Sequence, residues 1–321
     1  MTPYQSNRIR RPACGQSALV RGSALGHMTA MQVILAAFVP VLLTVLIGYW
    51  IAKANQPFDS KTITFLVGTI GTPVLVFTNL ARTTIDSAAL AEIMLATILA
   101  LTCFVILGIA MLKAAGLSLR AFLPSLAFPN TGNLGLPLAL YAFGQDGLNY
   151  AIAFFAIVSI CNHTIGQTIA AGRSNWRAPL KSPMVWAALI GIAWSFAKIP
   201  LPAWFDNTLS LLAGLTIPLL LLLMLGTALA RIPVTSFPRA AALSAMRVGM
   251  GIGVGFGVAA LFGFTGAERG AFVLQCAMPV AVYNYVYAQL YSTAPEDVAS
   301  LVVLSTVLSG LTVPVLLTIL T

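Results

Sequence analysis

Apolar runs of about twenty residues recur from residue 31 to the end of the chain, the length that a helix needs to cross a bilayer. Charged residues make up 8% of the 321 residues, and the mean hydropathy is +0.94. A soluble domain carries about a quarter of its residues as charges, so this composition cannot cover a water-exposed surface. The chain is therefore predicted to be an all-α polytopic membrane protein.

Ten transmembrane helices are predicted, and a polar connection divides them into two halves of five. The expected spans are residues 31–52, 62–81, 88–112, 121–143, 148–171, 183–198, 208–230, 238–263, 268–291 and 297–320. The connection, residues 172–182, separates a first half, 31–171, from a second half, 183–321. Residues 1–30 hold four arginines, no acid and no apolar stretch long enough for a signal sequence, so we expect a disordered tail there.

The basic residues between the helices predict how the chain is oriented. One set of alternate loops carries nine of them: Lys53, Lys61, Lys113, Arg120, Arg173, Arg177, Lys181, Arg231 and Arg239. The other set carries three: Arg82, Lys198 and Arg269. By the positive-inside rule, the 172–182 connection lies in the cytoplasm and both termini lie outside it, in a bacterial inner membrane. Orientation also accounts for the net charge of +9, because the basic residues form no stripe with aromatic residues of the kind that binds nucleic acid.

The two halves resemble each other when they are aligned at an offset of 150 residues. Identical pairs in this alignment are Ala121 and Ala271, Phe122 and Phe272, Pro129 and Pro279, and Tyr141 and Tyr291. Because each half has an odd number of helices, the second half enters the membrane from the opposite side. The pattern therefore predicts a 5+5 inverted repeat, whose two units can exchange inward-open and outward-open states.

Two of the expected helices are interrupted near their middle. The fourth contains the segment Phe128–Pro137, which reads FPNTGNLGLP, and the ninth contains Pro279 and then Asn284. Proline removes a backbone donor and clashes with the preceding turn, so carbonyl groups are left free where lipid offers no water. Half-helix N-termini at this depth favour an anion, and unwound carbonyl groups favour a cation. The alternative is a pair of proline kinks that serve packing alone.

The interrupted segments carry a family resemblance. Phe128–Pro137, Phe143-Gly144, Ala277-Met278-Pro279 and Leu304–Ser309 resemble the auxin efflux carrier family in its bacterial form, over nearly the whole chain from Met31 onward. The resemblance implies two inverted repeats, with a scaffold of helices 1, 2, 6 and 7. It also implies a transport unit in which broken helices 4 and 9 cross and which moves like an elevator.

The same resemblance implies a substrate class and its contacts. Bacterial relatives are described as permeases for malonate, malate or related carboxylates, and plant members export auxin, itself a carboxylate. The matching Pro-Asn-Thr motif implies that Asn130 contacts the substrate. Val280 follows Pro279, so helix 9 lacks the corresponding Pro-Asn pair, and the contact from that side falls to Asn284. The expected substrate site comprises Pro129, Asn130, Thr131, Asn133, Pro279 and Asn284.

Two further polar side chains lie inside expected helices. Arg247 is placed where a cation is costly and usually marks a pathway or a buried pair. It is a candidate to hold the substrate carboxylate; the alternatives are a structural pair, with Glu92 as the partner, or a side chain that reaches the cytoplasmic surface. His163, beside Asn162, is a candidate proton carrier because imidazole titrates near neutral pH, and the alternative is a histidine hydrogen-bonded within the bundle.

The remaining glycines and cysteines point to packing. Gly249, Gly253 and Gly257 share one helix face at intervals of four, which predicts close helix contact, and their spacing does not fit a dinucleotide-binding loop. Four cysteines lack CxxC spacing and are expected to be small core residues.

These patterns favour a secondary transporter for a small organic anion, such as malonate, malate or another carboxylate, embedded in the lipid bilayer. The chain has no GxxxxGK[ST] motif, and with two histidines and no HExxH motif it offers no metal or catalytic site, so neither a cofactor nor an enzyme is expected. A sodium-coupled symporter of the bile-acid type is the alternative. The coupling ion, H⁺ or Na⁺, the direction of transport and a homodimeric assembly are left open.

Overall fold

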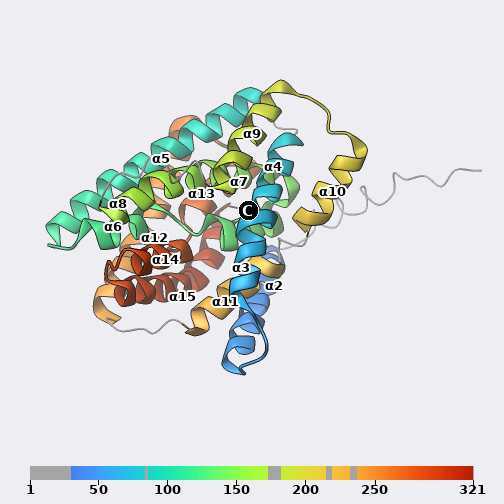
Figure 1. Cartoon of the computed structure of the whole chain (residues 1–321). Helices are drawn as coiled ribbons and strands as arrows, with labels where there is room; N and C mark the ends of the chain where they lie inside the picture. Colours follow the sequence, from blue (N-terminus) through green and yellow to red (C-terminus); the bar gives the residue numbers. More distant parts are fainter. Residues whose placement is uncertain (1–29, 84–85, 173–181, 215–218, 232–236, 321) are drawn as a thin grey trace, which may run out of the picture.

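The computed structural model describes residues 30–83, 86–172, 182–214, 219–231 and 237–320, and these fold almost entirely as helices (Figure 1). The elements are α2 (Ala30–Lys53), α3 (Ser60–Leu66), η1 (Val67–Gly71), α4 (Thr72–Ala81), α5 (Ser87–Ala114), α6 (Leu119–Ala127), η2 (Thr131–Gly135), α7 (Leu136–Cys161), η3 (Asn162–Gly166), α8 (Gln167–Ala171), α9 (Pro183–Ala197), α10 (Ala203–Gly214), α11 (Leu221–Arg231), α12 (Phe237–Phe262), α13 (Gly266–Cys276), α14 (Val282–Leu290) and α15 (Pro295–Leu320). The η elements are short π-helical segments. Residues 1–29 of the expected tail and 173–181 of the expected linker lie outside the described residues.

Five expected spans coincide, to within two residues at each end, with the single helices α2, α5, α9, α12 and α15. The span expected at 208–230 is different, because α10 begins at Ala203. The amide of Asp206 donates to the carbonyl of Pro202 at 2.9 Å, which closes the first turn. A proline that precedes a helix costs it no hydrogen bond, so the helix starts directly after Pro202 instead of several residues later.

The fourth and fifth expected helices follow one another without a loop. The sequence predicts a connection between residues 143 and 148, but α7 runs from Leu136 to Cys161 and changes direction at a single residue, Gly144. That residue has φ 68° and ψ −158°, a backbone conformation that glycine reaches without a steric penalty. One glycine therefore replaces the expected turn.

Four helices in the described part of the chain are long and apolar enough to cross a membrane. They are Ser87–Ala114, Thr131–Ala171, Phe237–Phe262 and Pro295–Leu320. Large apolar side chains face outward from them; Ile106, Leu261 and Leu311 are 61%, 73% and 70% exposed. Such a surface is stable against lipid, so the chain is a polytopic membrane protein.

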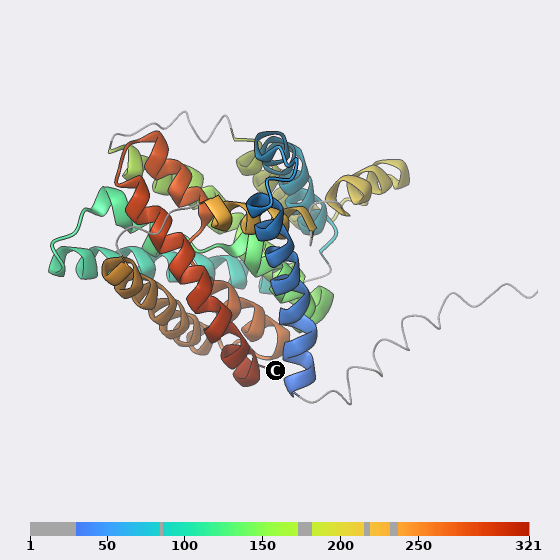
Figure 2. The same cartoon turned by 90° about the horizontal axis from the view of Figure 1, so that it is seen from below.

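The helices fall into two groups, which lie on opposite sides of the molecule in both views (Figures 1 and 2). In one group α2 packs along α11, and α4 packs along α9 and α10. In the other, α12 packs against α5, α13 and α15. A Cβ added to Gly226 would lie 2.0 Å from the carbonyl oxygen of Val45, so α2 and α11 touch through their backbones. The two groups meet along α7.

The glycine-rich helix α12 packs through a different face from the one expected. A Cβ added at Gly249, Gly253 or Gly257 would meet no atom of the described residues within 4 Å, so the predicted packing face is wrong. At Gly251 it would lie 2.3 Å from the carbonyl oxygen of Cys276, and at Gly255 it would lie 3.0 Å from the Cys276 Cβ. The contact face is thus offset by two residues and lies against α13.

Candidate functional site

Two helices are broken by short extended segments, each of which contains a proline. α6 ends at Ala127 and helical structure resumes with η2 at Thr131, whereas α13 ends at Cys276 and α14 starts at Val282. Phe128 has φ −112° and ψ 103°, and Ala281 has φ −68° and ψ 138°, which are extended conformations. Pro129 and Pro279 cannot donate a helical hydrogen bond, which explains why both helices stop there.

The two extended segments lie against each other. The amide of Asn130 donates to the carbonyl of Pro279 at 2.7 Å, and the amide of Ala281 donates to the carbonyl of Phe128 at 3.4 Å. These bonds belong to an isolated antiparallel bridge between Pro129 and Val280. We call residues 128–130 and 279–281 the crossover. The two interruptions meet as the sequence predicts, and they satisfy part of each other's exposed backbone.

Two of the three asparagines expected at the substrate, Asn130 and Asn284, lie at the crossover and are buried. Asn130 is 4% exposed and Asn284 is 2% exposed. The Asn284 Nδ2 donates to the carbonyl of Phe128 at 3.1 Å, which orients its amide and directs Oδ1 away from that carbonyl. Neither the Nδ2 of Asn130 nor the Oδ1 of Asn284 has a hydrogen-bond partner among the described residues. Buried polar atoms of this kind are uncommon and indicate that another molecule completes their hydrogen bonding.

Two helix N-termini converge on the crossover. η2 begins at Thr131 and continues into α7, and α14 begins at Val282, so both present their first amide groups to the same region. The first turn of a helix has unbonded N–H groups and a partial positive charge, which together favour an anion. Thr131 is 1% exposed, and Asn133 is partly buried in the same π-helical segment.

Arg247 adjoins the crossover from α12 and is fully buried. Its Nη2 donates to the carbonyl of Cys276 at 2.8 Å, and its guanidinium carbon lies 4.6 Å from the centre of the Phe104 ring. The Arg247 side chain therefore does not reach the cytoplasmic surface, and that alternative is wrong. Glu92 is exposed and precedes Phe104 on α5 by 12 residues, about 18 Å of helix, so it is not the partner of Arg247. Nε and Nη1 of Arg247 have no hydrogen-bond partner among the described residues.

His163 lies in η3 and faces α14. Its Nδ1 is 2.8 Å from the carbonyl oxygen of Ser159, and its ring centre is 5.4 Å from that of Tyr283 and 6.4 Å from that of Tyr287. The histidine is thus hydrogen-bonded within the bundle, beside the helix that follows the second break.

Gln275 is a site residue that sequence reasoning missed. It is fully buried, its Nε2 donates to the carbonyl of Ala151 at 3.3 Å, and its Oε1 has no partner among the described residues. A Cβ added to Gly135 would lie 2.0 Å from that Oε1, so the glutamine packs against the π-helical segment η2. A polar residue four positions before Pro279 in an apolar span is the sequence feature that marks it.

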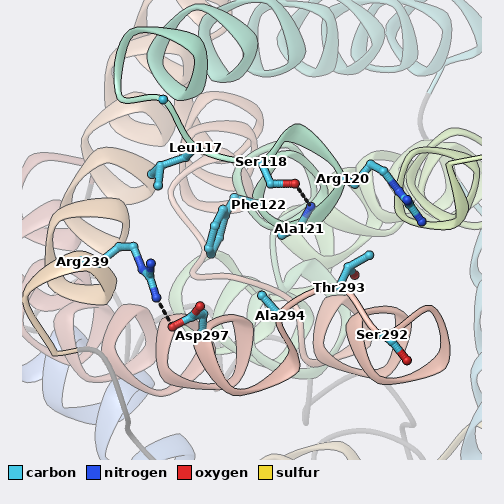
Figure 3. A pocket seen from close by; sticks show the side chains of 11 residues that line it. Leu117, Ser118, Arg120, Ala121, Phe122, Arg239, Ser292, Thr293, Ala294 and Asp297 are labelled. Carbon is cyan, nitrogen blue, oxygen red and sulfur yellow. Dashed lines mark hydrogen bonds and ion pairs between the residues drawn. The ribbon is translucent and has the colours of Figure 1, made fainter.

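A hollow of about 400 Å³ lies at the end of α6 remote from the crossover, between that helix and the connection from α14 to α15 (Figure 3). Arg239 and Asp297 form an ion pair on its edge, and the guanidinium carbon of Arg239 lies 5.8 Å from the centre of the Phe122 ring. Arg120 points toward α8, where its Nη2 donates to the carbonyls of Ala170 and Ala171 at 3.4 and 3.2 Å. Both arginines that line the hollow therefore already have partners.

The chain matches the model of a known protein family. A family model described as membrane transport protein, that of the auxin efflux carrier family, matches residues 33–175 and 167–317. The chain belongs to this family. Membership identifies it as a membrane transport protein, which agrees with the expectation of a transporter.

Two archaeal relatives in this family are described as uncharacterized transporters. The protein from Methanothermobacter thermautotrophicus is 25% identical over 292 residues, which cover 85% of this chain and 94% of the relative. The protein from Methanocaldococcus jannaschii is 25% identical over 312 residues, which cover 89% of this chain and 97% of the relative. The similarity thus extends over nearly the full length of both relatives.

Proposed function

We propose that this chain is a secondary transporter that moves a small organic anion, such as malonate, malate or another carboxylate, by alternating access of the elevator type. The observation that carries the proposal is the crossover, where the amide of Asn130 is bonded to the carbonyl of Pro279. It brings two helix N-termini to one buried place in a chain whose outer surface is apolar. A carboxylate supplies the negative charge and the acceptor oxygens that free amide groups require.

Several residues at and beside the crossover each contribute to binding the carboxylate. The Nδ2 of Asn130 is a buried donor that has no hydrogen-bond partner in the described part of the chain, so it donates to a carboxylate oxygen. Asn133 presents its backbone amide from the start of η2, and Thr131 lies in the same first turn with its own amide bonded to the carbonyl of Pro129 at 2.9 Å. Pro129 and Pro279 keep the two segments extended. Asn284 contributes from α14. Arg247 adds positive potential from the far side of Cys276, where its guanidinium already bonds a carbonyl.

The elevator movement is supported by the division of the helices into two groups that meet along α7. In this proposal the group of α2, α4, α9, α10 and α11 is the scaffold, and the group that contains the crossover moves. The two segments matched by the family model, 33–175 and 167–317, are consistent with ten helices in a 5+5 inverted repeat. We propose a bacterial inner membrane as the location, with both termini outside the cytoplasm.

We propose H⁺ as the coupling ion, with His163 as its carrier beside the crossover. The alternative is Na⁺, as in symporters of the bile-acid type, held by unwound carbonyl groups. His163→Gln distinguishes them, because it flattens the pH dependence of uptake only if the imidazole carries the proton.

The test is uptake of radiolabelled malonate, malate and succinate into proteoliposomes, with Na⁺, pH and voltage varied separately. Wild type takes up at least one of these anions, and Asn130→Ala lowers the rate by about tenfold or more, because it removes a buried donor to the carboxylate. Asn207→Ala is the matched control, because Asn207 is exposed on α10. Absence of carboxylate uptake, or equal rates in wild type and Asn130→Ala, contradicts the proposal.

A further inference from the structure

Phe128 connects the crossover to a second set of polar side chains. Its carbonyl accepts from the Nδ2 of Asn284 at 3.1 Å. Its ring lies against Gly166 at the end of η3: a Cβ added there would be 2.8 Å from the Phe128 Cε2 and 2.4 Å from the Asn162 Oδ1. The amide oxygen of Asn162 and the ring of Phe128 therefore crowd the same glycine. The π-helical segment η3 brings the fifth helix to the edge of the crossover, and π-helical segments often occur at functional sites.

Tyr287 faces the same place from α14. It follows Asn284 by three residues, so the two side chains share a helix face, and its ring centre is 6.4 Å from that of His163, the neighbour of Asn162. The Nδ1 of His163 lies 2.8 Å from the carbonyl oxygen of Ser159 and must donate to it. In the neutral imidazole this leaves Nε2 as a hydrogen-bond acceptor.

Three polar atoms of these side chains lack hydrogen-bond partners among the described residues. Asn162, Asn284 and Tyr287 are 6%, 2% and 5% exposed. The Oδ1 atoms of both asparagines and the hydroxyl of Tyr287 have no hydrogen-bond partner among the described residues. Three buried side chains from two helices thus have unused hydrogen-bonding capacity beside the crossover, which is a costly arrangement unless a ligand or water completes it.

The two asparagine Oδ1 atoms exclude a carboxylate as their ligand, whereas the hydroxyl of Tyr287 can either donate or accept a hydrogen bond. Amide oxygens and a neutral imidazole nitrogen accept hydrogen bonds, and a carboxylate can only accept them too. The ligand group must therefore donate. Residues 128–136, 159–167 and 278–288 contain no Asp or Glu, so an ammonium group would be buried without a counter-charge. A neutral hydroxyl fits both requirements.

We propose that Asn162, Asn284 and Tyr287 form a second subsite, beside the crossover, that binds a hydroxyl group of the substrate, so that the transported anion is a hydroxycarboxylate. The inference rests on the proposed function, since the helix N-termini hold the carboxylate of the same molecule. The hydroxyl donates to an asparagine Oδ1 and accepts from the hydroxyl of Tyr287. A carboxylate without a hydroxyl leaves these buried atoms unpaired and binds less tightly.

The experiment compares acids that differ only by a hydroxyl group: malate with succinate, and lactate with propionate. Uptake of each radiolabelled acid into proteoliposomes is measured, together with the rise in melting temperature that each produces in the purified protein. Wild type prefers each hydroxy acid by about tenfold, the factor that one hydrogen bond of ordinary strength supplies. Asn162→Leu and Tyr287→Phe each reduce this ratio to about threefold or less. Tyr285→Phe is the matched control and keeps the ratio, because its hydroxyl accepts from Gln289 at 2.6 Å on the same helix.

The outcomes separate the two proposals. If wild type transports carboxylates but does not distinguish the members of a pair, the hydroxyl subsite is overturned and the proposed function stands. The same conclusion follows if both variants lower uptake of the two members in equal proportion. If malonate is transported but none of the four acids is, the subsite falls and the proposed function stands; if neither malonate nor any of the four acids is transported or raises the melting temperature, both fall.

Discussion

The guanidinium of Arg247 donates a 2.8 Å hydrogen bond to the carbonyl oxygen of Cys276, the last residue of α13. The last carbonyls of a helix have no partner within it, and the C-terminal end carries partial negative charge. A half-helix that ends inside the protein therefore needs a donor, and the buried arginine supplies it from α12. The Phe104 ring, on α5, covers the guanidinium, and its centre lies 4.6 Å from the guanidinium carbon.

We predict that Arg247→Gln lowers the free energy of unfolding by about 1–3 kcal/mol, the cost of leaving a buried carbonyl without its donor. Thermal unfolding of the purified protein in detergent measures this as a lower melting temperature. Arg269→Gln is the control, because Arg269 is exposed and its guanidinium lies over the Phe256 ring. Equal melting temperatures for the two variants would show that Arg247 does not cap α13.

Gly135→Ala is predicted to disturb the crossover through Gln275. The new Cβ would lie 2.0 Å from the Gln275 Oε1, so the glutamine must leave its place against Ala151 or η2 must shift. We expect a loss of about 1–3 kcal/mol in stability, as for other overpacked cores, and slower carboxylate uptake. The double variant with Gln275→Ala recovers part of the loss, because the clashing atom is gone. A double variant no better than the single one would contradict this explanation.

Ser305 supports the crossover from α15 by accepting a hydrogen bond from the amide of Val280 at 3.1 Å. We predict that Ser305→Ala lowers the melting temperature and the rate of uptake, since the buried amide then has no acceptor. Ser309 is a matched control one turn further along α15: it is 1% exposed, and its hydroxyl has no partner among the described residues. Ser309→Ala should therefore be neutral or slightly stabilising. The prediction fails if the two variants behave alike.

The interruptions could be predicted from the sequence because their cause is local. Pro129 and Pro279 each remove a backbone donor wherever they stand in a helix, and the offset of 150 residues between them indicated that the two breaks correspond. The long apolar runs likewise fix where helices such as α5 and α15 begin and end, because the thickness of the bilayer sets their length.

The partners across helices could not be predicted, because they depend on how the helices pack. The sequence suggested Glu92 as the partner of Arg247, because it is the acid within an apolar span. In the structure the carbonyl of Cys276, left free where α13 ends, accepts the hydrogen bond of the guanidinium instead, so no second buried charge is required. The subsite around Asn162 and Tyr287 depends on η3, and a π-helical segment shifts the facing of the residues that follow it. No periodicity in a uniformly apolar span reveals such a shift.

The two glycine faces of α12 give the last prediction. Gly251→Ala places a Cβ 2.3 Å from the carbonyl oxygen of Cys276, and backbone cannot move aside without separating α12 from α13. We expect a loss of about 1–3 kcal/mol in stability and impaired uptake, because the displaced carbonyl is the one that Arg247 binds. Gly253→Ala adds a methyl group where no atom in the described part of the chain lies within 4 Å, so the higher helix propensity of alanine leaves stability equal or raised by up to about 1 kcal/mol. Melting temperatures of the two variants measure the difference, and a greater loss for Gly253→Ala would restore the packing face that the spacing of four suggests.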